Sequence, residues 1–543
     1  MVFARRSTTL LAAIIASCAM VLSLTACTSD NKTVVDGQTT VTSNSAGGVA
    51  VFTPSDGITL NQQTPLNKWA KLVPDLAKAL ADAGFKKGDI DHTTSDSLAK
   101  QSRAIQDFVV DHLSNNTTDD SGIAIAPDNM TLLVAPVVEA DASTRQYGDY
   151  ISQNLSTNDA TDEGATSDGE SSKDDSSKDD SSNTESDSTA SDEQAQAVDR
   201  LVSSLKLAKE SGMHVVLLGN SIEGYKPDAF VKFSDAQTIG KLQAEKMVSK
   251  LKLDKASKDN PKYIEVLLPY TAVDEKGNAN DSAFAQEAFR GIWQVLGSYY
   301  QKGVVESPSG TLDGKSTEND WQAVAYDAAE ESSTAKVLDK RLAKTDGQST
   351  LTRIDGIITM NDYIASEVVK ELDDLGYTGS AADINPQITI SGIVGNITGK
   401  KDLSRDAVPD PIKSPENDNA NDSSSSDDDA DEDTSASDKD RDSQWPLVTG
   451  YGAYVSNIPS IVNGKQWMTG MEDRQTIATD IAQACAKLNK DEALNSMPSI
   501  RNSEVGGVKK IPTISEPLLA VSASNLKSAL IDPGYISLAD AGL

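Results

Sequence analysis

From residue 48 onward, short continuous apolar runs alternate with stretches whose apolar side chains recur at helical spacing. The apolar runs lie at residues 49–52, 131–137, 214–219, 230–233, 263–268, 357–360, 388–394 and 447–450. A short run that is apolar at successive positions is typical of a strand covered on both faces. Strands that alternate with helices predict parallel sheets with helices on both sides. Because 543 residues leave room for two such sheets, we predict an α/β protein of two lobes.

Three stripes of apolar side chains at helical spacing lie between these runs. They consist of Trp69, Leu72, Leu76 and Leu80; of Ala285, Ala288, Phe289, Ile292 and Leu296; and of Ile364, Val368, Leu372 and Leu375. The first stripe contains Pro74, which either kinks the helix or marks its late start, because proline lacks an N–H and collides with the preceding turn. A further stripe contains Cys485, where we expect a buried thiol rather than a nucleophile.

The acidic charge is concentrated in two tracts. The chain has 49 Lys and Arg against 82 Asp and Glu, for a net charge of −33. Residues 156–195 contribute 13 acids and 2 bases, and residues 416–442 contribute 12 acids and 2 bases. Both tracts are rich in Ser and Asp and cannot bury enough apolar surface to offset the entropy of ordering, so we predict disordered insertions that folding does not need. A chain this acidic is not expected to bind nucleic acid or anionic lipid.

The N-terminus predicts export. Arg5 and Arg6 precede an apolar stretch at 10–22, which is typical of a secretory signal and short for a membrane span. Leu-Thr-Ala-Cys, ending at Cys27, resembles the lipobox of bacterial lipoproteins, in which the cysteine is lipidated and becomes the first mature residue. We therefore predict a signal peptide at 1–26, an anchored Cys27 and a flexible tether at 27–47. The alternative is an ordinary signal peptide with an incidental cysteine.

The sequence offers no catalytic constellation. The three histidines, His92, His112 and His214, are not spaced with other ligands as in a zinc site. Residues 219–224 come close to the Gly-x-Ser-x-Gly pattern of serine hydrolases, but Glu223 replaces the second glycine. We therefore predict no metal, no cofactor and no enzymatic activity.

Several stretches resemble the type 1 periplasmic binding proteins, and most closely the xylose- and multiple-monosaccharide-binding proteins of ABC importers. The resemblance rests on Lys68-Trp69 after 51–54, on 230–235 with Ile239-Gly240, on 360–365, on 445–450 with 461–469, and on 508–512 with 516–519. It covers most of residues 48–543 outside the acidic tracts and is strongest after His214. It implies two Rossmann-like lobes with parallel sheets, joined by a multi-strand hinge that closes on a ligand.

The same resemblance implies the lobe boundaries. The N-terminal lobe is expected at 48–235 and the C-terminal lobe at 236–470. Residues 471–500 are expected to return to the first lobe, and 501–543 to form a tail on the C-terminal lobe or the hinge.

A ligand site between the lobes also follows from the resemblance. It would consist of Lys68, Trp69, Asn220, Asp235, Asn361, Asp362 and Tyr451. Trp69 would stack on a sugar ring, although a tryptophan on the core face of a helix explains the pattern equally well. Asp235, Asn361 and Asp362 could instead cap the helices that follow them.

Four positions depart from the family pattern, because Val138, Gly219, Gly452 and Glu472 stand where the family has other, mostly charged, groups. The expected function is a monomeric, lipid-anchored solute-binding protein on the extracytoplasmic face of the cell membrane. It would bind a small polar ligand, with a monosaccharide favoured, and deliver it to the permease subunits of an ABC importer. The departures keep open an alternative, a binding-protein-like sensor or surface interaction protein that has lost transport.

Overall fold

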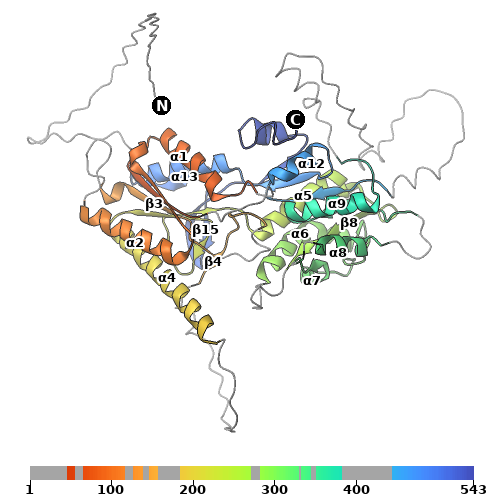
Figure 1. The fold of residues 1–543 in the computed structure, drawn as a ribbon, viewed down its shortest axis with the longest axis horizontal. Helices are drawn as coiled ribbons and strands as arrows, with labels where there is room; N and C mark the ends of the chain where they lie inside the picture. The colour runs from red at the N-terminus through yellow and green to blue at the C-terminus, as the bar shows by residue number, and fades with distance from the viewer. Residues whose placement is uncertain are drawn as a thin grey trace, which may run out of the picture. The chain divides into compact units, whose positions relative to one another are not determined.

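The computed structural model describes residues 46–55, 65–115, 126–138, 146–156, 184–270, 282–328, 330, 332–343, 350–381 and 443–543 (Figure 1). The predicted signal peptide, Cys27, the expected strand at 388–394 and the second acidic tract lie outside these residues. No helix in the described part of the chain is both long and apolar enough to cross a bilayer.

The larger sheet has seven strands in the order β15-β16-β7-β5-β3-β1-β2. They are β1 (Gly48–Pro54), β2 (Ile90–Ser95), β3 (Met130–Val134), β5 (His214–Leu218), β7 (Ala229–Lys232), β15 (Ile500–Val505) and β16 (Val508–Ser515). All neighbours are parallel except β15 and β16, which form an antiparallel hairpin.

Helices cover both faces of this sheet, as the continuous apolar runs predict. Side chains of successive strand residues point to opposite faces. In β1, Val49 and Val51 belong to the core shared with α1 (Trp69–Asp82) and α13 (Arg474–Leu488). Ala50 and Phe52 belong to the core shared with α2 (Leu98–Asn115) and α4 (Thr184–Glu210). Cys485 lies fully buried in α13 as a free thiol, and burial raises its pKa.

The second sheet has four parallel strands in the order β10-β8-β12-β13. They are β8 (Lys262–Val266), β10 (Val305–Glu306), β12 (Gly356–Ile358) and β13 (Leu447–Thr449). Its core includes side chains of α5 (Ala236–Leu251), α6 (Ala283–Gln301), α8 (Ser333–Arg341) and α9 (Asp362–Leu375). Smaller elements are α7 (Trp321–Val324), α12 (Ile458–Val462) and the strand pairs β4 (Asn154–Leu155) with β6 (Ser221–Ile222) and β9 (Leu268–Pro269) with β11 (Ala325–Tyr326).

The described chain passes between the two sheets three times. It crosses from β7 to α5, from β14 (Met468–Met471) back to α13, and from β16 to β17 (Leu519–Ser522). Strands β14 and β17 pair antiparallel at this junction. Two parallel-sheet lobes joined by several crossing segments are the fold class predicted from the sequence, which is therefore confirmed.

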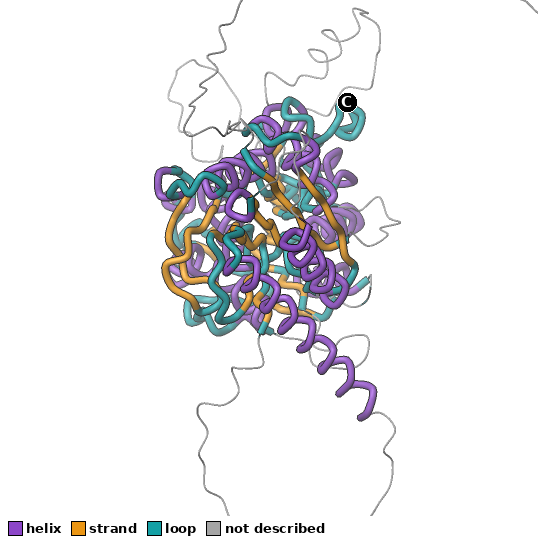
Figure 2. The backbone as a smooth tube through the Cα atoms, turned by 90° about the vertical axis from the view of Figure 1, so that its left-hand side faces the viewer, coloured by secondary structure: helices purple, strands orange, loops and turns teal. Residues whose placement is uncertain are grey.

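Two details differ from the expectations, and one of two alternatives left open for Pro74 is excluded. Strands β15 and β16 join the seven-stranded sheet instead of the second lobe, because β16 supplies the edge partner that β7 would otherwise lack. Helix α4 begins at Thr184, inside the tract predicted as disordered at 156–195 (Figure 2). A helix propagates easily once started, so the buried stripe that begins at Ala197 extends it toward the N-terminus. Helix α1 begins at Trp69, so Pro74 does not mark a late start.

Candidate functional site

A buried polar triad lies where the chain crosses between the lobes. Ser234 follows β7, Tyr451 follows β13 and Glu472 follows β14. The Ser234 N–H donates to Glu472 Oε1 at 2.5 Å, and the Tyr451 hydroxyl lies 3.5 Å from the same oxygen. The Ser234 and Tyr451 hydroxyls are also hydrogen-bonded to each other. Tyr451 therefore links the second sheet directly to two crossing segments.

The triad holds a carboxyl group away from water. Glu472 is fully buried, and desolvation raises its pKa to about 7 despite the hydrogen bonds from Ser234. Burial, reinforced by the Glu472 carboxylate, holds the pKa of Tyr451 well above its usual value. Glu472, one of the four positions at which the sequence departs from the resemblance, therefore lies at the hinge.

Asp362 forms a second buried network next to Gly450. Its carboxylate accepts hydrogen bonds from the Tyr454 N–H at 2.9 Å, from Gln466 Nε2 at 2.7 Å and from the Thr469 hydroxyl at 2.8 Å. Desolvation raises the pKa of Asp362 to about 6. A Cβ at position 450 would lie 2.1 Å from Asp362 Oδ1, so the network requires glycine there. Asp362 in this structure ties α9 to the crossing strand β14.

Lys68 and Trp69 lie at the start of α1. The Trp69 ring is 3% exposed and makes edge contacts with Tyr150 and Phe233, at 5.1 and 5.7 Å between ring centroids. Lys68 Nζ pairs with Asp149 Oδ1 at 2.9 Å, and the Trp69 N–H donates to Asp149 Oδ2 at 3.1 Å. Both predicted residues thus contact side chains of their own chain.

Two predicted amides lie at the carboxyl ends of strands, one in each lobe. Asn220 follows β5, donates to the Pro136 carbonyl at 2.9 Å and accepts from the Gln153 N–H at 3.0 Å. Asn361 follows β12, caps α9 by accepting from the Ile364 N–H at 2.9 Å, and donates to Gln146 Oε1 at 3.1 Å. Parallel α/β sheets bind ligands at this edge.

Asp235 caps α5, accepting from the Thr238 N–H at 2.7 Å, and pairs with Lys232 at 2.8 Å. In this structure Asp235 and Asn361 therefore cap the helices that follow them, which is the alternative predicted for them from the sequence. The ligand roles of all seven residues stay predictions.

Sequence reasoning missed the segment Gln146–Gln153, which reaches the predicted residues from both lobes. It includes Tyr147 and Tyr150, each 1% exposed. Tyr147 packs into the core of the second lobe and Tyr150 into that of the first. The only signal in the sequence was the pair of tyrosines flanking Gly148-Asp149, shortly before a tract that is otherwise polar.

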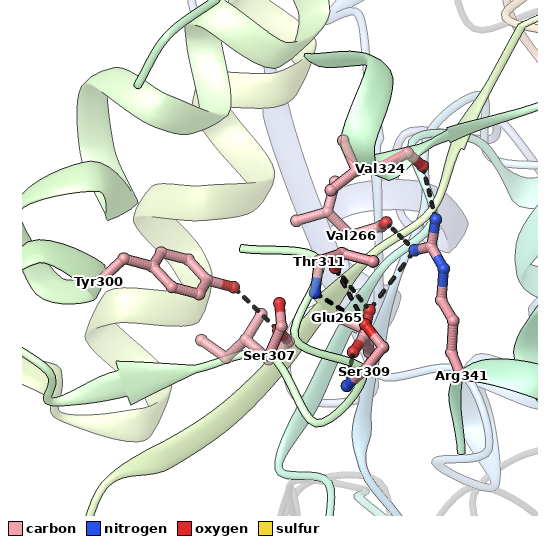
Figure 3. Close-up of polar contacts among 9 residues, drawn as sticks. Glu265, Val266, Tyr300, Ser307, Ser309, Thr311, Val324 and Arg341 are labelled. Atoms are coloured by element: carbon pink, nitrogen blue, oxygen red, sulfur yellow. Dashed lines mark hydrogen bonds and ion pairs between the residues drawn. The ribbon is translucent and has the colours of Figure 1, made fainter. Parts of the chain in front are cut away.

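A separate charged cluster belongs to the interior of the second lobe (Figure 3). Glu265 on β8 is fully buried and lies 3.4 Å from Arg341 of α8. Glu265 also accepts from the Ser309 N–H at 2.8 Å, and Arg341 donates to the carbonyls of Val266 and Val324 at 2.5 and 2.9 Å. Because these groups satisfy one another, the cluster is a structural tie between β8, α8 and the neighbouring loops.

One surface hollow of the described residues lies away from the predicted ligand residues. A hollow of about 460 Å³ lies on the surface of α8 and α9, lined by Ser332, Ala335, Glu367, Lys370, Glu371 and Asp374, and it contains none of the predicted residues. Among the residues that the structure describes, no three His, Cys, Asp or Glu side chains gather as a metal site would require.

Comparison with known proteins gave structural matches alone. No protein-family model and no curated protein matches the chain. An ABC transporter solute-binding protein from Clostridium phytofermentans with bound β-D-glucose is 16% identical, over 91% of this chain and 99% of that one, with a TM-score of 0.45. A carbohydrate transporter solute-binding protein from Chloroflexus aurantiacus in complex with D-glucose is 17% identical, over 92% and 98%, with a TM-score of 0.44. A sugar ABC transporter protein from Actinomyces odontolyticus is 10% identical, over 89% and 97%, with a TM-score of 0.45.

Proposed function

We propose that this chain is an extracytoplasmic solute-binding protein of an ABC importer, anchored to the membrane through a lipid on Cys27. Its ligand would be a small polar molecule, with a monosaccharide favoured, held between the lobes. The observation that carries the proposal is the architecture, in which two parallel-sheet lobes are joined by three crossing segments. Hinged lobes of this kind can open and close on a ligand.

The position of the polar residues supports the same site. Asn220 and Ser234 follow strands of the first sheet, and Asn361 and Tyr451 follow strands of the second. All four come after the carboxyl ends of their strands, which is the edge where open α/β sheets bind ligands. Amide and hydroxyl groups there can exchange hydrogen bonds with sugar hydroxyls, and the Trp69 ring would offer an aromatic face if Tyr150 moved away from it.

A second candidate function is a binding-protein-like sensor or surface interaction protein. The specific observation in its favour is that the residues expected to meet a solute already contact side chains of this chain. Trp69 meets Tyr150, Lys68 meets Asp149, and Asn361 meets Gln146. A protein of this kind would not need to admit a solute.

Thermal denaturation of the protein with a panel of monosaccharides, sugar acids and nucleosides tests the proposal. A ligand at one hundred times its Kd adds about 2.7 kcal/mol to the free energy of unfolding, so one member should raise the melting temperature by a few degrees. Isothermal calorimetry should then give one site per chain. A panel that leaves the melting temperature unchanged would count against the carrier and favour the sensor.

The anchor is tested separately in cells. We expect the parent chain in the membrane fraction and the Cys27→Ser variant in the soluble exported fraction, since lipidation requires the thiol. Equal membrane retention of both would contradict the anchor.

A further inference from the structure

The segment Gln146–Gln153 lies in the chain between β3 and α4, beyond the carboxyl end of a central strand. We propose that it is a tethered ligand, a stretch of peptide that occupies the solute site and with which any solute must compete. The inference rests on the proposed position of that site between the lobes. The inference also names a further class of ligand. A site that holds this segment would recognise an acidic peptide that contains tyrosine.

The segment contacts the first lobe through both backbone and side chains. The Asp149 N–H donates to the Asn67 carbonyl at 2.8 Å, while the Asp149 carboxylate pairs with Lys68 and accepts from the Trp69 N–H. The Tyr150 hydroxyl donates to the Lys68 carbonyl at 2.5 Å, and its ring stacks on Phe233 at 4.8 Å between centroids.

The segment contacts the second lobe as well. Its Gln146 side chain accepts from Asn361, and its Gln146 carbonyl accepts from the Tyr454 hydroxyl at 2.6 Å. The Tyr147 ring lies 4.8 Å from Phe284 and 6.3 Å from Tyr451, measured between centroids.

The rest of the segment reaches the polar residues of the first lobe. The Ser152 N–H donates to the Ser234 carbonyl at 3.3 Å, and the Gln153 N–H donates to Asn220 Oδ1. Five of the seven residues predicted to bind a solute, Lys68, Trp69, Asn220, Asn361 and Tyr451, therefore contact this segment. A ligand that bridges two lobes makes contacts of the same kind, because closure requires groups from both.

A substitution of Gly148 can displace the segment from the site and still keep every side chain that makes a contact. It has a φ of +95°, and a Cβ there would lie 2.6 Å from the Asn67 carbonyl oxygen and 2.7 Å from Asn67 Cβ. Both of these atoms belong to backbone or sit next to it, so they cannot move aside easily. Gly148→Ala should therefore unseat the segment. Gly224→Ala is the matched control, because Gly224 also has a positive φ, +69°, but no atom lies within 4 Å of its would-be Cβ.

The experiment compares the full chain with its Gly148→Ala and Gly224→Ala variants, using two readouts. The first is calorimetric titration with a synthetic peptide of residues 146–153, Gln-Tyr-Gly-Asp-Tyr-Ile-Ser-Gln. The second is chymotrypsin cleavage after Tyr147 and Tyr150, identified by fragment mass. We expect Gly148→Ala to bind one peptide per chain and to be cut at both tyrosines at least tenfold faster than the parent. The parent and Gly224→Ala should bind no peptide and resist cleavage there.

Two results would overturn the proposal: no peptide binding with undiminished protection in Gly148→Ala, or equal peptide binding by the parent. Should Gly148→Ala not fold, Asp149→Ala takes its place, because it loses the Lys68 pair and leaves the tyrosines in place.

A sugar titration then separates this inference from the proposed function. A sugar bound with equal affinity by the parent and by Gly148→Ala refutes the tethered ligand and leaves the carrier intact. Peptide binding by Gly148→Ala without any sugar binding supports the tethered ligand and refutes the sugar carrier, whereas a sugar bound at least tenfold tighter by Gly148→Ala supports both.

Discussion

The Glu472 carboxyl group is buried where two crossing segments meet, so its titration should make the free energy of unfolding depend on pH. Its folded pKa, about 7, lies above the ordinary value of 4.5 for an unfolded chain. The folded state therefore holds a proton that the unfolded state releases between about pH 4.5 and 7. A group with a raised carboxyl pKa stabilises the fold at low pH and loses that contribution as the pH rises through this window.

Glu472→Gln should remove this part of the pH dependence. Glutamine keeps an acceptor for the Ser234 N–H and carries no charge, so the variant should lie within about 1 kcal/mol of the parent at pH 5 and exceed it by about 3 kcal/mol at pH 8. Urea denaturation at the two pH values measures the difference. Glu245→Gln is the control, because Glu245 is exposed in an i,i+4 pair with Lys241. An equal effect of Glu472→Gln at both pH values would contradict the burial argument.

The buried Glu265–Arg341 pair should also contribute measurably to the stability of the chain. Removing one member of a buried pair leaves the other without a counter-charge, so Arg341→Met should cost about 3–5 kcal/mol in free energy of unfolding. The double variant Glu265→Gln/Arg341→Met should cost less than the sum of the two single changes, because the residues interact directly. Urea denaturation of all three variants measures this coupling.

Arg290→Met is the matched control for Arg341→Met. Arg290 pairs with Glu287 on an exposed helical face, so its loss should cost at most about 1 kcal/mol. Additive effects in the double variant would show that the Glu265–Arg341 contact contributes no coupling.

At the level of single elements, the C-terminal boundary predicted for the first acidic tract, residue 195, differs from the structure. Helix α4 reaches back to Thr184, whereas its buried side chains begin with Ala197 and Val198. Charge and Ser content indicate how little apolar surface a segment can bury. They do not indicate how far a helix that starts at a neighbouring apolar stripe extends into that segment. The helices of α6 and α9 were predictable, because their stripes are long and regular.

We expect that residues 157–183 do not contribute to folding. Replacing them with a Gly/Ser segment of equal length removes their charge and keeps the spacing between Ser156 and Thr184. The melting temperature should change by less than a few degrees, since the buried contacts of α4 start beyond this stretch. Replacing residues 196–208 in the same way removes those contacts and should prevent folding. A large drop in melting temperature with the first replacement would contradict the prediction.

At the scale of the whole molecule, each lobe has its own apolar core, and the described segment Gln146–Gln153 contributes to both. Tyr147 and Ile151 belong to the core of the second lobe, and Tyr150 belongs to that of the first. Together with the Ser234–Tyr451–Glu472 triad, this segment adds polar and aromatic contacts between the lobes. An apolar cluster that includes Met471 of β14 and Val521 of β17 also lies where the chain crosses between the sheets.

The two-sheet α/β class is predictable from the amino-acid sequence, as are most of the buried strands and the major helices, because the spacing of apolar residues is a local property that follows the strand and helix repeats. The sequence also pointed to the carboxyl ends of β5, β7, β12 and β13 as the edge that carries polar side chains. The contacts of those side chains depend on how distant parts of the chain pack together. Gln146 and Asn361, or Ser234 and Glu472, are separated by more than two hundred residues, and no periodicity within one segment encodes such pairings. Strand order has the same origin, because β16 pairs with β7 although the strands of the second sheet lie between them in the chain.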